Sequence, residues 1–156
     1  VEAYQNVKTD KKLVIAGGSS DTNSFMRELK DLAKDDERIV FTGFVQGKML
    51  DELYSNAYLY TLPSDLEGMP LSLLEAMSYG NCCLVSNIPE CAEVVEDKAL
   101  LFEKSNVNDL VTTLQNACEK KEMVWKFKHE AADFICGKYN WDDVVKKTVE
   151  LYRGDK

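Results

Sequence analysis

The sequence predicts an α/β fold in which a parallel sheet carries helices on both faces. Short apolar runs alternate with stretches whose apolar residues recur every three or four positions, the pattern of successive strand–helix units. Gly, Pro or Asn stands at many of the boundaries between these segments. With 156 residues the chain has room for one domain and one core. We therefore expect residues 1–156 to form a single domain.

Each element follows from its local pattern. Residues 1–4 have the character of a helix end. Strands are predicted at apolar or β-branched runs, namely residues 13–16, 39–42, 58–62, 82–86 and 99–102. Helices are predicted where apolar residues repeat at helical spacing, often behind a capping residue or a proline. They cover residues 23–34, 46–56, 72–79, 90–96, 108–117, 123–136 and 141–152.

One segment carries more chemical information than the rest: Glu67-Gly68-Met69-Pro70-Leu71-Ser72-Leu73-Leu74-Glu75. A predicted strand precedes it, and the helix that follows is stopped by Gly80. A helix N-terminus therefore lies just beyond the carboxyl end of a strand, where free N–H groups and the helix dipole suit a phosphate. The flanking carboxylates are good acceptors for hydroxyl groups. An anion site between two hydroxyl acceptors matches a sugar nucleotide.

The same segment resembles the E-x7-E motif of the retaining glycosyltransferases of family 4 (glycosyl transferases group 1). The context agrees, with Pro63-Ser64 before the first acid and Glu75-Ala76-Met77 in the helix. Asn81-Cys82-Cys83 departs from the Gly-x-Pro-Val-Val usual in that family but keeps a small-residue strand start. The resemblance covers about residues 1–153. It implies the Rossmann-like C-terminal domain of a two-domain enzyme with the GT-B fold, the domain that binds the nucleotide sugar.

The resemblance implies a role for each part of the motif. Glu67 would be the catalytic residue that positions the donor sugar and stabilises charge at its anomeric carbon, rather than a proven nucleophile. Glu75 would accept hydrogen bonds from the two ribose hydroxyls. The helix entry would bind the sugar or the diphosphate through Gly68, Met69, Pro70, Leu71 and Ser72. The structural alternatives are a turn position for Glu67, a salt bridge or an exposed position for Glu75, and ordinary packing for the helix entry.

Two further loops resemble parts of the family's donor site. Gly17-Gly18-Ser19-Ser20 follows the first strand and is similar to a Gly-x-Gly loop that borders the donor cleft. Taken alone, it would simply connect a strand to a helix. Gly43-Phe44-Val45 follows the second strand and is similar to a loop that brackets the nucleotide base. Phe44 could equally be a core residue.

The resemblance also implies a strand that is not in this sequence. In the family, this domain begins with a strand that ends in Gly-Arg, and a Lys opens the helix that follows. Here residues 1–4 read as part of that helix, so the Arg and Lys that hold the donor diphosphate are missing. In the order 3-2-1-4-5-6 the missing strand is the central one. Because unpaired buried strand edges are costly, we expect the gap to close by rearrangement, by strand exchange between chains, or with residues absent from this sequence.

Composition excludes several function classes. A net charge of −8 argues against nucleic acid and against a basic membrane-binding face. No apolar run is long enough to cross a bilayer, and no signal peptide is recognised. We expect a cytoplasmic protein, membrane-peripheral at most. The five cysteines lack Cys-x-x-Cys spacing, so we expect reduced core residues and no metal site.

Aromatic and histidine positions give two further expectations. His129 lies in a charged helical stretch and is expected on the surface. Trp125, Phe127 and Trp141 are expected to pack the C-terminal helices.

The prediction for function is the donor-binding half of a glycosyltransferase that uses a UDP- or GDP-sugar and no cofactor. The acceptor, a saccharide or a lipid-linked sugar, would be held by an N-terminal domain outside these residues. Residues 1–156 alone would be inactive. The alternatives are a non-catalytic Rossmann-like nucleotide-binding module with a vestigial motif and a GT-B-type sugar-nucleotide epimerase. The epimerase would need further acids and histidines that the sequence does not show.

Overall fold

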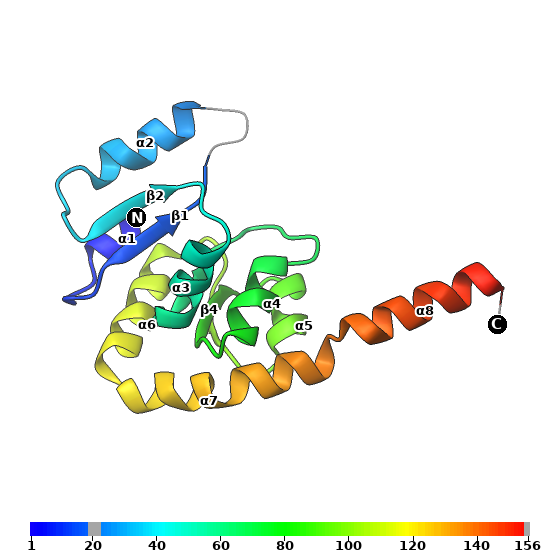
Figure 1. Cartoon of the computed structure of the whole chain (residues 1–156). Helices are drawn as coiled ribbons and strands as arrows, with labels where there is room; N and C mark the ends of the chain where they lie inside the picture. Colours follow the sequence, from blue (N-terminus) through cyan, green and yellow to red (C-terminus); the bar gives the residue numbers. More distant parts are fainter. Residues whose placement is uncertain (19–22, 155–156) are drawn as a thin grey trace.

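The computed structural model describes residues 1–18 and 23–154, which form eight helices and five strands (Figure 1). Ser19 and Ser20 of the predicted glycine loop lie outside the described residues. The elements, in chain order, are α1 (Glu2–Gln5), β1 (Leu13–Ala16), α2 (Asn23–Ala33), β2 (Ile39–Gly43), α3 (Lys48–Asn56), β3 (Tyr60–Leu62), α4 (Leu71–Ser78), β4 (Cys83–Ser86), α5 (Pro89–Val95), β5 (Leu100–Phe102), α6 (Val107–Glu119), α7 (Lys121–Lys138) and α8 (Trp141–Arg153).

All strand pairs are parallel, and a helix lies between each strand and the next along the chain. Parallel neighbours need such crossovers, so the alternation seen in the sequence produces the predicted α/β fold. The predicted strands are confirmed, with starts that differ by two residues at most. The largest difference is at β3, which begins at Tyr60 rather than at residue 58.

The strands form two sheets rather than one. β1 pairs with β2, and β3, β4 and β5 form a separate sheet in that order. Among the described residues, no strand pairs with the second edge of β1 or of β3. The gap expected at the central position therefore does not close by rearrangement within the chain. In the predicted strand order, no described strand remains to occupy that position.

The core is centred on β4. Cys83, Leu84 and Val85 are fully buried, because helices cover both faces of this strand. The larger core cluster joins β4 to α4, α5 and α7, and it includes Leu73 and Met77 of α4. Gly80, at φ 73°, ends α4 as predicted, and a β-carbon placed on it would lie 3.5 Å from the carbonyl oxygen of Lys128 in α7. Because α4 is well packed in the core, the position of its first turn is fixed.

The C-terminal helix is the part of the chain that packs least. In Figure 1, α8 extends away from the body beyond the end of α7, and none of its residues is buried. Trp141 is 79% exposed, and Trp125 of α7 is 64% exposed. The prediction that these tryptophans pack the C-terminal helices is therefore wrong, whereas Phe127 does pack in the smaller core cluster. Trp141 begins α8, and no other helix lies beside α8 for this side chain to pack on in the described ranges.

The burial of the cysteines and of the histidine agrees with most of the predictions made for them. Three of the cysteines are buried, namely Cys82, Cys83 and Cys91. Cys118 is half-buried and Cys136 is exposed, so the core prediction is wrong for Cys136, and all five thiols are free. His129 is exposed, as predicted. Of the helices in the described ranges, none combines the length and the apolar character that crossing a membrane requires.

Candidate functional site

The site is built around the first turn of α4, directly after the loop that leaves β3. Pro70 is buried and precedes the helix by one residue. Its carbonyl accepts hydrogen bonds from the N–H of Leu73 (2.9 Å) and from the next residue (3.2 Å). The N–H of Leu71 donates to the carbonyl of Met69 (2.8 Å). Within the described part of the chain, the N–H of Ser72 finds no acceptor, so it is available to a ligand.

Two side chains of the helix entry are exposed. Met69 is 49% exposed and Leu71 is 60% exposed. A β-carbon placed on Gly68 would meet no atom within 4 Å, so the protein itself does not require a glycine there. The backbone of the entry is thus open on its outer side. A bound group could approach it closely only because Gly68 lacks a side chain.

Glu67 is half-buried in the loop between β3 and α4. Its Oε1 accepts a hydrogen bond from the Ser64 hydroxyl at 2.6 Å. The nearby Tyr60 is half-buried, and burial raises the pKa of its phenol to about 12, with a smaller contribution from the charge of Glu67. The carboxylate is therefore held by a hydroxyl and lies beside a phenol that stays protonated at neutral pH.

Glu75 is exposed on the second turn of α4. The Tyr54 hydroxyl, from α3, donates to its Oε2 at 3.2 Å and to the carbonyl of Ser72 at 3.4 Å. No ion pair within residues 1–18 and 23–154 includes Glu75 or Glu67, so the salt-bridge alternative does not apply there. Burial raises the pKa of Tyr54, and the charges of Tyr60 and Glu75 raise it further.

Two tyrosines connect the two acids. The Tyr60 hydroxyl donates to Ser72 Oγ at 2.9 Å, which leaves the Ser72 proton free to donate elsewhere. The Tyr54 and Tyr60 rings lie 6.1 Å apart. Tyr54 contacts Glu75, and the charge of Glu67 acts on the pKa of the Tyr60 phenol, so each acid interacts with one tyrosine of the pair. Sequence reasoning missed both tyrosines, because their partners come from neighbouring elements rather than from local spacing.

The other predicted contacts lie on the first sheet. The N–H of Gly17 donates to the carbonyl of Gly43 at 2.8 Å, which joins the ends of β1 and β2. Gly17 has φ 137°, a conformation that favours glycine. Gly18 is exposed, Phe44 is 76% exposed and Val45 is half-buried. Phe44 is therefore not a core residue.

The structure thus groups the predicted residues into two sets. Glu67, Ser72 and Glu75 lie together at the start of α4, whereas Gly17, Gly18, Phe44 and Val45 lie at the ends of β1 and β2. No hydrogen bond among the described residues joins the two sets. Each set lies beyond the carboxyl ends of parallel strands, the usual ligand-binding edge in α/β sheets.

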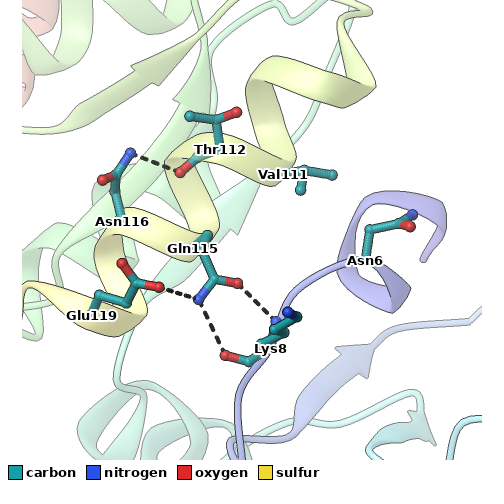
Figure 2. Close-up of a pocket in the computed structure, with 7 residues that line it drawn as sticks. All are labelled: Asn6, Lys8, Val111, Thr112, Gln115, Asn116 and Glu119. Carbon is teal, nitrogen blue, oxygen red and sulfur yellow. Dashed lines mark hydrogen bonds between the residues drawn. The ribbon is translucent and has the colours of Figure 1, made fainter.

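A surface pocket of about 440 Å³ lies elsewhere, against α6 (Figure 2). It is lined by Asn6, Lys8, Val111, Thr112, Gln115, Asn116 and Glu119, none of which was predicted as a site residue. The Gln115 side chain accepts from the N–H of Lys8 (2.8 Å) and donates to its carbonyl (3.3 Å). This pocket lies where the segment before β1 is hydrogen-bonded to α6. In the described ranges, no three His, Cys, Asp or Glu side chains are grouped to hold a metal ion.

Taken together, these features define a Rossmann-like α/β domain with a polar site at the carboxyl ends of its strands. A sequence profile of the family glycosyl transferases group 1 matches residues 1–134. The chain therefore belongs to the glycosyl transferases group 1 family, which confirms the resemblance found in the sequence. The family 4 subclass remains a prediction.

Relatives of known sequence support the assignment. The chain is 29% identical over 148 residues to an uncharacterised glycosyltransferase of Methanocaldococcus jannaschii, covering 91% of this chain and 37% of that protein. It is 24% identical over 158 residues to the O-antigen chain mannosyltransferase B of Escherichia coli, covering 98% and 41%. It is 27% identical over 158 residues to the glycogen synthase of Thermodesulfovibrio yellowstonii, covering 99% and 31%. The chain thus spans about two fifths or less of the length of these relatives.

Solved structures confirm the fold. The chain matches Anabaena HepE, determined in complex with UDP and glucose, with a TM-score of 0.89 at 15% identity, covering 98% of this chain and 43% of that one. It matches the sucrose-phosphate synthase of Thermosynechococcus elongatus with a TM-score of 0.82 at 23% identity, covering 92% and 38%. This likeness over nearly the whole chain confirms the predicted fold class.

Proposed function

We propose that residues 1–156 form the donor-binding half of a retaining glycosyltransferase. The complete enzyme would move a sugar from a nucleoside diphosphate sugar to a saccharide or lipid-linked acceptor. One observation carries the proposal: Glu67 and Glu75 stand on either side of the first turn of α4, and a hydroxyl group from Ser64 or Tyr54 holds each carboxylate. The turn between them presents the free N–H of Ser72.

The proposed division of labour follows from the chemistry of these groups. Carboxylates accept hydrogen bonds from hydroxyls, so Glu75 would bind the two ribose hydroxyls. The N-terminus of α4 would face the diphosphate through the Ser72 N–H and the helix dipole. The Ser72 hydroxyl would add a second donor, because its oxygen already accepts from Tyr60. The exposed ring of Phe44 and the backbone of Val45 would contact the base, beside the Gly17-Gly18 loop.

Glu67 would act on the sugar. It is half-buried and fixed by Ser64, so it can hold the sugar hydroxyls near the reacting carbon. Its negative charge would stabilise the positive charge that develops at the anomeric carbon in the transition state. Retention would follow from front-face attack, in which the leaving phosphate takes the proton of the acceptor hydroxyl. Glu67 then positions and stabilises, without forming a covalent bond.

Several contributions would come from outside this set of residues. The chain supplies no cation to the start of α4 in the described ion pairs, so Arg and Lys side chains that neutralise the diphosphate would come from elsewhere in the protein. The acceptor would likewise be held by a second domain. A UDP- or GDP-sugar fits the names of the relatives and neighbours, which include a mannosyltransferase and a UDP complex. No cofactor is invoked, and the reaction would take place in the cytoplasm.

Calorimetric titration of the full-length protein with UDP, GDP and ADP tests the proposal. Glu75→Ala should weaken binding of the preferred nucleotide about 10- to 100-fold, the effect of losing hydrogen bonds to a charged acceptor. Glu67→Ala should leave nucleotide affinity within about twofold and lower sugar transfer about 100-fold. Glu52→Ala is the control, since Glu52 is exposed on α3 and pairs only with Lys48.

The outcomes separate the proposed function from its rivals. Wild-type protein that binds no nucleoside diphosphate, or a Glu75→Ala variant that binds like wild type, would contradict it. Nucleotide binding that depends on Glu75 but is accompanied by no sugar transfer to any acceptor would favour the non-catalytic module. Interconversion of the donor sugar without transfer would indicate an epimerase.

A further inference from the structure

We propose that Tyr54 is a positioning residue that orients the Glu75 carboxylate and thereby makes the site selective for ribose over deoxyribose nucleotides. The inference rests on the proposed function, in which Glu75 binds the ribose hydroxyls. Tyr54 lies on α3, whereas Glu75 lies on α4, so the contact depends on how the two helices pack.

Apart from Tyr54, little holds the Glu75 side chain in place. The side chain is exposed, and no ion pair in the described ranges includes it. An exposed glutamate samples many rotamers, and fixing one of them on ligand binding costs conformational entropy. The Tyr54 hydroxyl, 3.2 Å from Oε2, restricts that freedom before a ligand arrives. This distance is long for an O–H···O bond, so the effect of the tether should be moderate.

The Tyr54 side chain is itself held in place by its neighbours. Its ring stacks on Tyr79, with centroids 5.3 Å apart and planes inclined by 25°. The Tyr79 hydroxyl is anchored in turn to Asp51 Oδ1 at 2.6 Å. The carbonyl of Tyr54 accepts from Asn81 Nδ2 at 2.9 Å, and Asn81 is buried. The hydroxyl that contacts Glu75 therefore belongs to a side chain whose backbone and ring are both held in place.

The hydrogen bond from Tyr54 leaves most of the Glu75 carboxylate available to a ligand. A carboxylate offers about four lone-pair directions, and Tyr54 uses one of them, on Oε2. Oε1 and the second lone pair of Oε2 remain for two neighbouring hydroxyls. The other contact of the Tyr54 hydroxyl, to the Ser72 carbonyl, is longer at 3.4 Å, so the hydroxyl should act mainly through Glu75 and mainly affect ligands that carry both ribose hydroxyls. A ligand without them would bind through its base and phosphates and would not respond to the tether.

The experiment compares a ribonucleoside diphosphate with its 2′,3′-dideoxy analogue by calorimetry on the full-length protein. UDP and 2′,3′-dideoxy-UDP serve as the probes, or the corresponding guanosine pair if the protein prefers GDP. Tyr54→Phe removes the hydroxyl and keeps the stacked ring. Its affinity for the ribonucleotide should fall about three- to tenfold, as expected for one long hydrogen bond to a charged group. Its affinity for the dideoxy analogue should stay within about twofold, so the ratio of the two affinities falls.

Two further variants serve as controls. Tyr58→Phe removes a hydroxyl that donates to the carbonyl of Ala117 at 2.8 Å, away from α4, and should leave the affinity ratio unchanged. In a Glu75→Ala background, Tyr54→Phe should have no further effect on either probe, because the group that it orients is gone.

Equal losses for both probes in Tyr54→Phe would show a merely structural role and overturn the inference, as would no change for either probe. A wild-type protein that binds both probes equally, or neither, would instead contradict the proposed role of Glu75 and the inference with it. That failure is visible in the wild-type measurement alone, so the two failures can be told apart.

Discussion

At the residue scale, Tyr60 links the parts of the candidate site. It is half-buried at the start of β3, donates to Ser72, and has the ring of Tyr54 as a neighbour. Burial raises the pKa of its phenol to about 12, so it remains a neutral donor at every physiological pH. Its hydrogen bond leaves the Ser72 hydroxyl free to donate outward. A phenylalanine at this position would remove that constraint on Ser72 while keeping the ring.

The raised pKa of Tyr60 predicts a pH dependence of stability. The folded protein retains a proton near pH 11 that an unfolded chain, with a tyrosine pKa of about 10, releases. The unfolding free energy contributed by Tyr60 is therefore present below pH 10 and is lost as the pH rises towards 12. The loss is about 2 to 3 kcal/mol as an upper limit. Urea denaturation of wild type and Tyr60→Phe at pH 9, 10.5 and 11.5 measures it.

The expected result is a difference in unfolding free energy between wild type and variant that changes over this pH range. Tyrosines that do not interact with Tyr60 titrate alike in both proteins and cancel in the difference, whereas the variant also removes the contribution of Tyr60 to the raised pKa of Tyr54. A difference that is the same at all three pH values would show that the phenol is not protected from ionisation. The Tyr60 phenol would then have to be more exposed to solvent than the structure indicates.

The residues of the candidate site differ in how far the sequence alone could predict them. Glu67 and Glu75 follow from local spacing around a helix start, so the sequence is enough to nominate them. Tyr54 and Tyr60 could not be nominated, because their hydroxyls meet α4 across 12 to 21 positions of the chain. Such contacts depend on how α3, β3 and α4 pack. The sequence shows only that an aromatic residue occupies each position.

At the element scale, periodicity predicts that a helix forms but does not predict what covers it. α4 and α8 both begin and end close to the predicted positions. α4 buries Leu73, Ala76 and Met77 against β4 and α7, and Asn81 after it donates to the carbonyls of Tyr54 and Ala76. α8 has the same kind of apolar spacing and buries none of its residues. The prediction that Trp125 and Trp141 are packed is wrong for the same reason, since the spacing of apolar residues does not show which surface covers them.

The uncovered state of α8 predicts fast hydrogen exchange. A 13-residue helix with no buried side chain has only its local hydrogen bonds and caps, and isolated helices shorter than about 12 to 15 residues are marginal in water. In residues 1–156, amides of α8 should exchange within seconds, whereas amides of β4 should be protected by the global stability. Exchange followed by mass spectrometry on peptides from 141–153 and 83–86 measures this. Equal protection of the two peptides would mean that some surface covers α8.

At the scale of the whole molecule, the strand order could be predicted but the closure of the sheet could not. Parallel pairing and helical crossovers place β1 beside β2 and leave β3, β4 and β5 together, as the doubly wound order requires. The edges of β1 and β3 that face the central position remain unpaired among the described residues. The sequence offered rearrangement, strand exchange or outside residues as ways to close them, and its pattern contains nothing that chooses among these. In residues 1–18 and 23–154, the strands do not rearrange to close these edges.

The open edge of β3 gives a test that separates the remaining routes. The N–H of Tyr60 donates to the carbonyl of Cys82, directly before β4, so the backbone groups of Thr61, the next residue, face the opposite edge. We predict that the Thr61 amide exchanges fast when residues 1–156 are monomeric and slowly in the full-length protein, where an added strand covers the edge. Sedimentation velocity gives the oligomeric state, and exchange measured by NMR gives the protection of this amide. Slow exchange that appears only as residues 1–156 dimerise would indicate strand exchange instead. A monomer of 1–156 with a protected Thr61 amide would contradict the open edge itself, because some strand of the same chain would then have to occupy the gap.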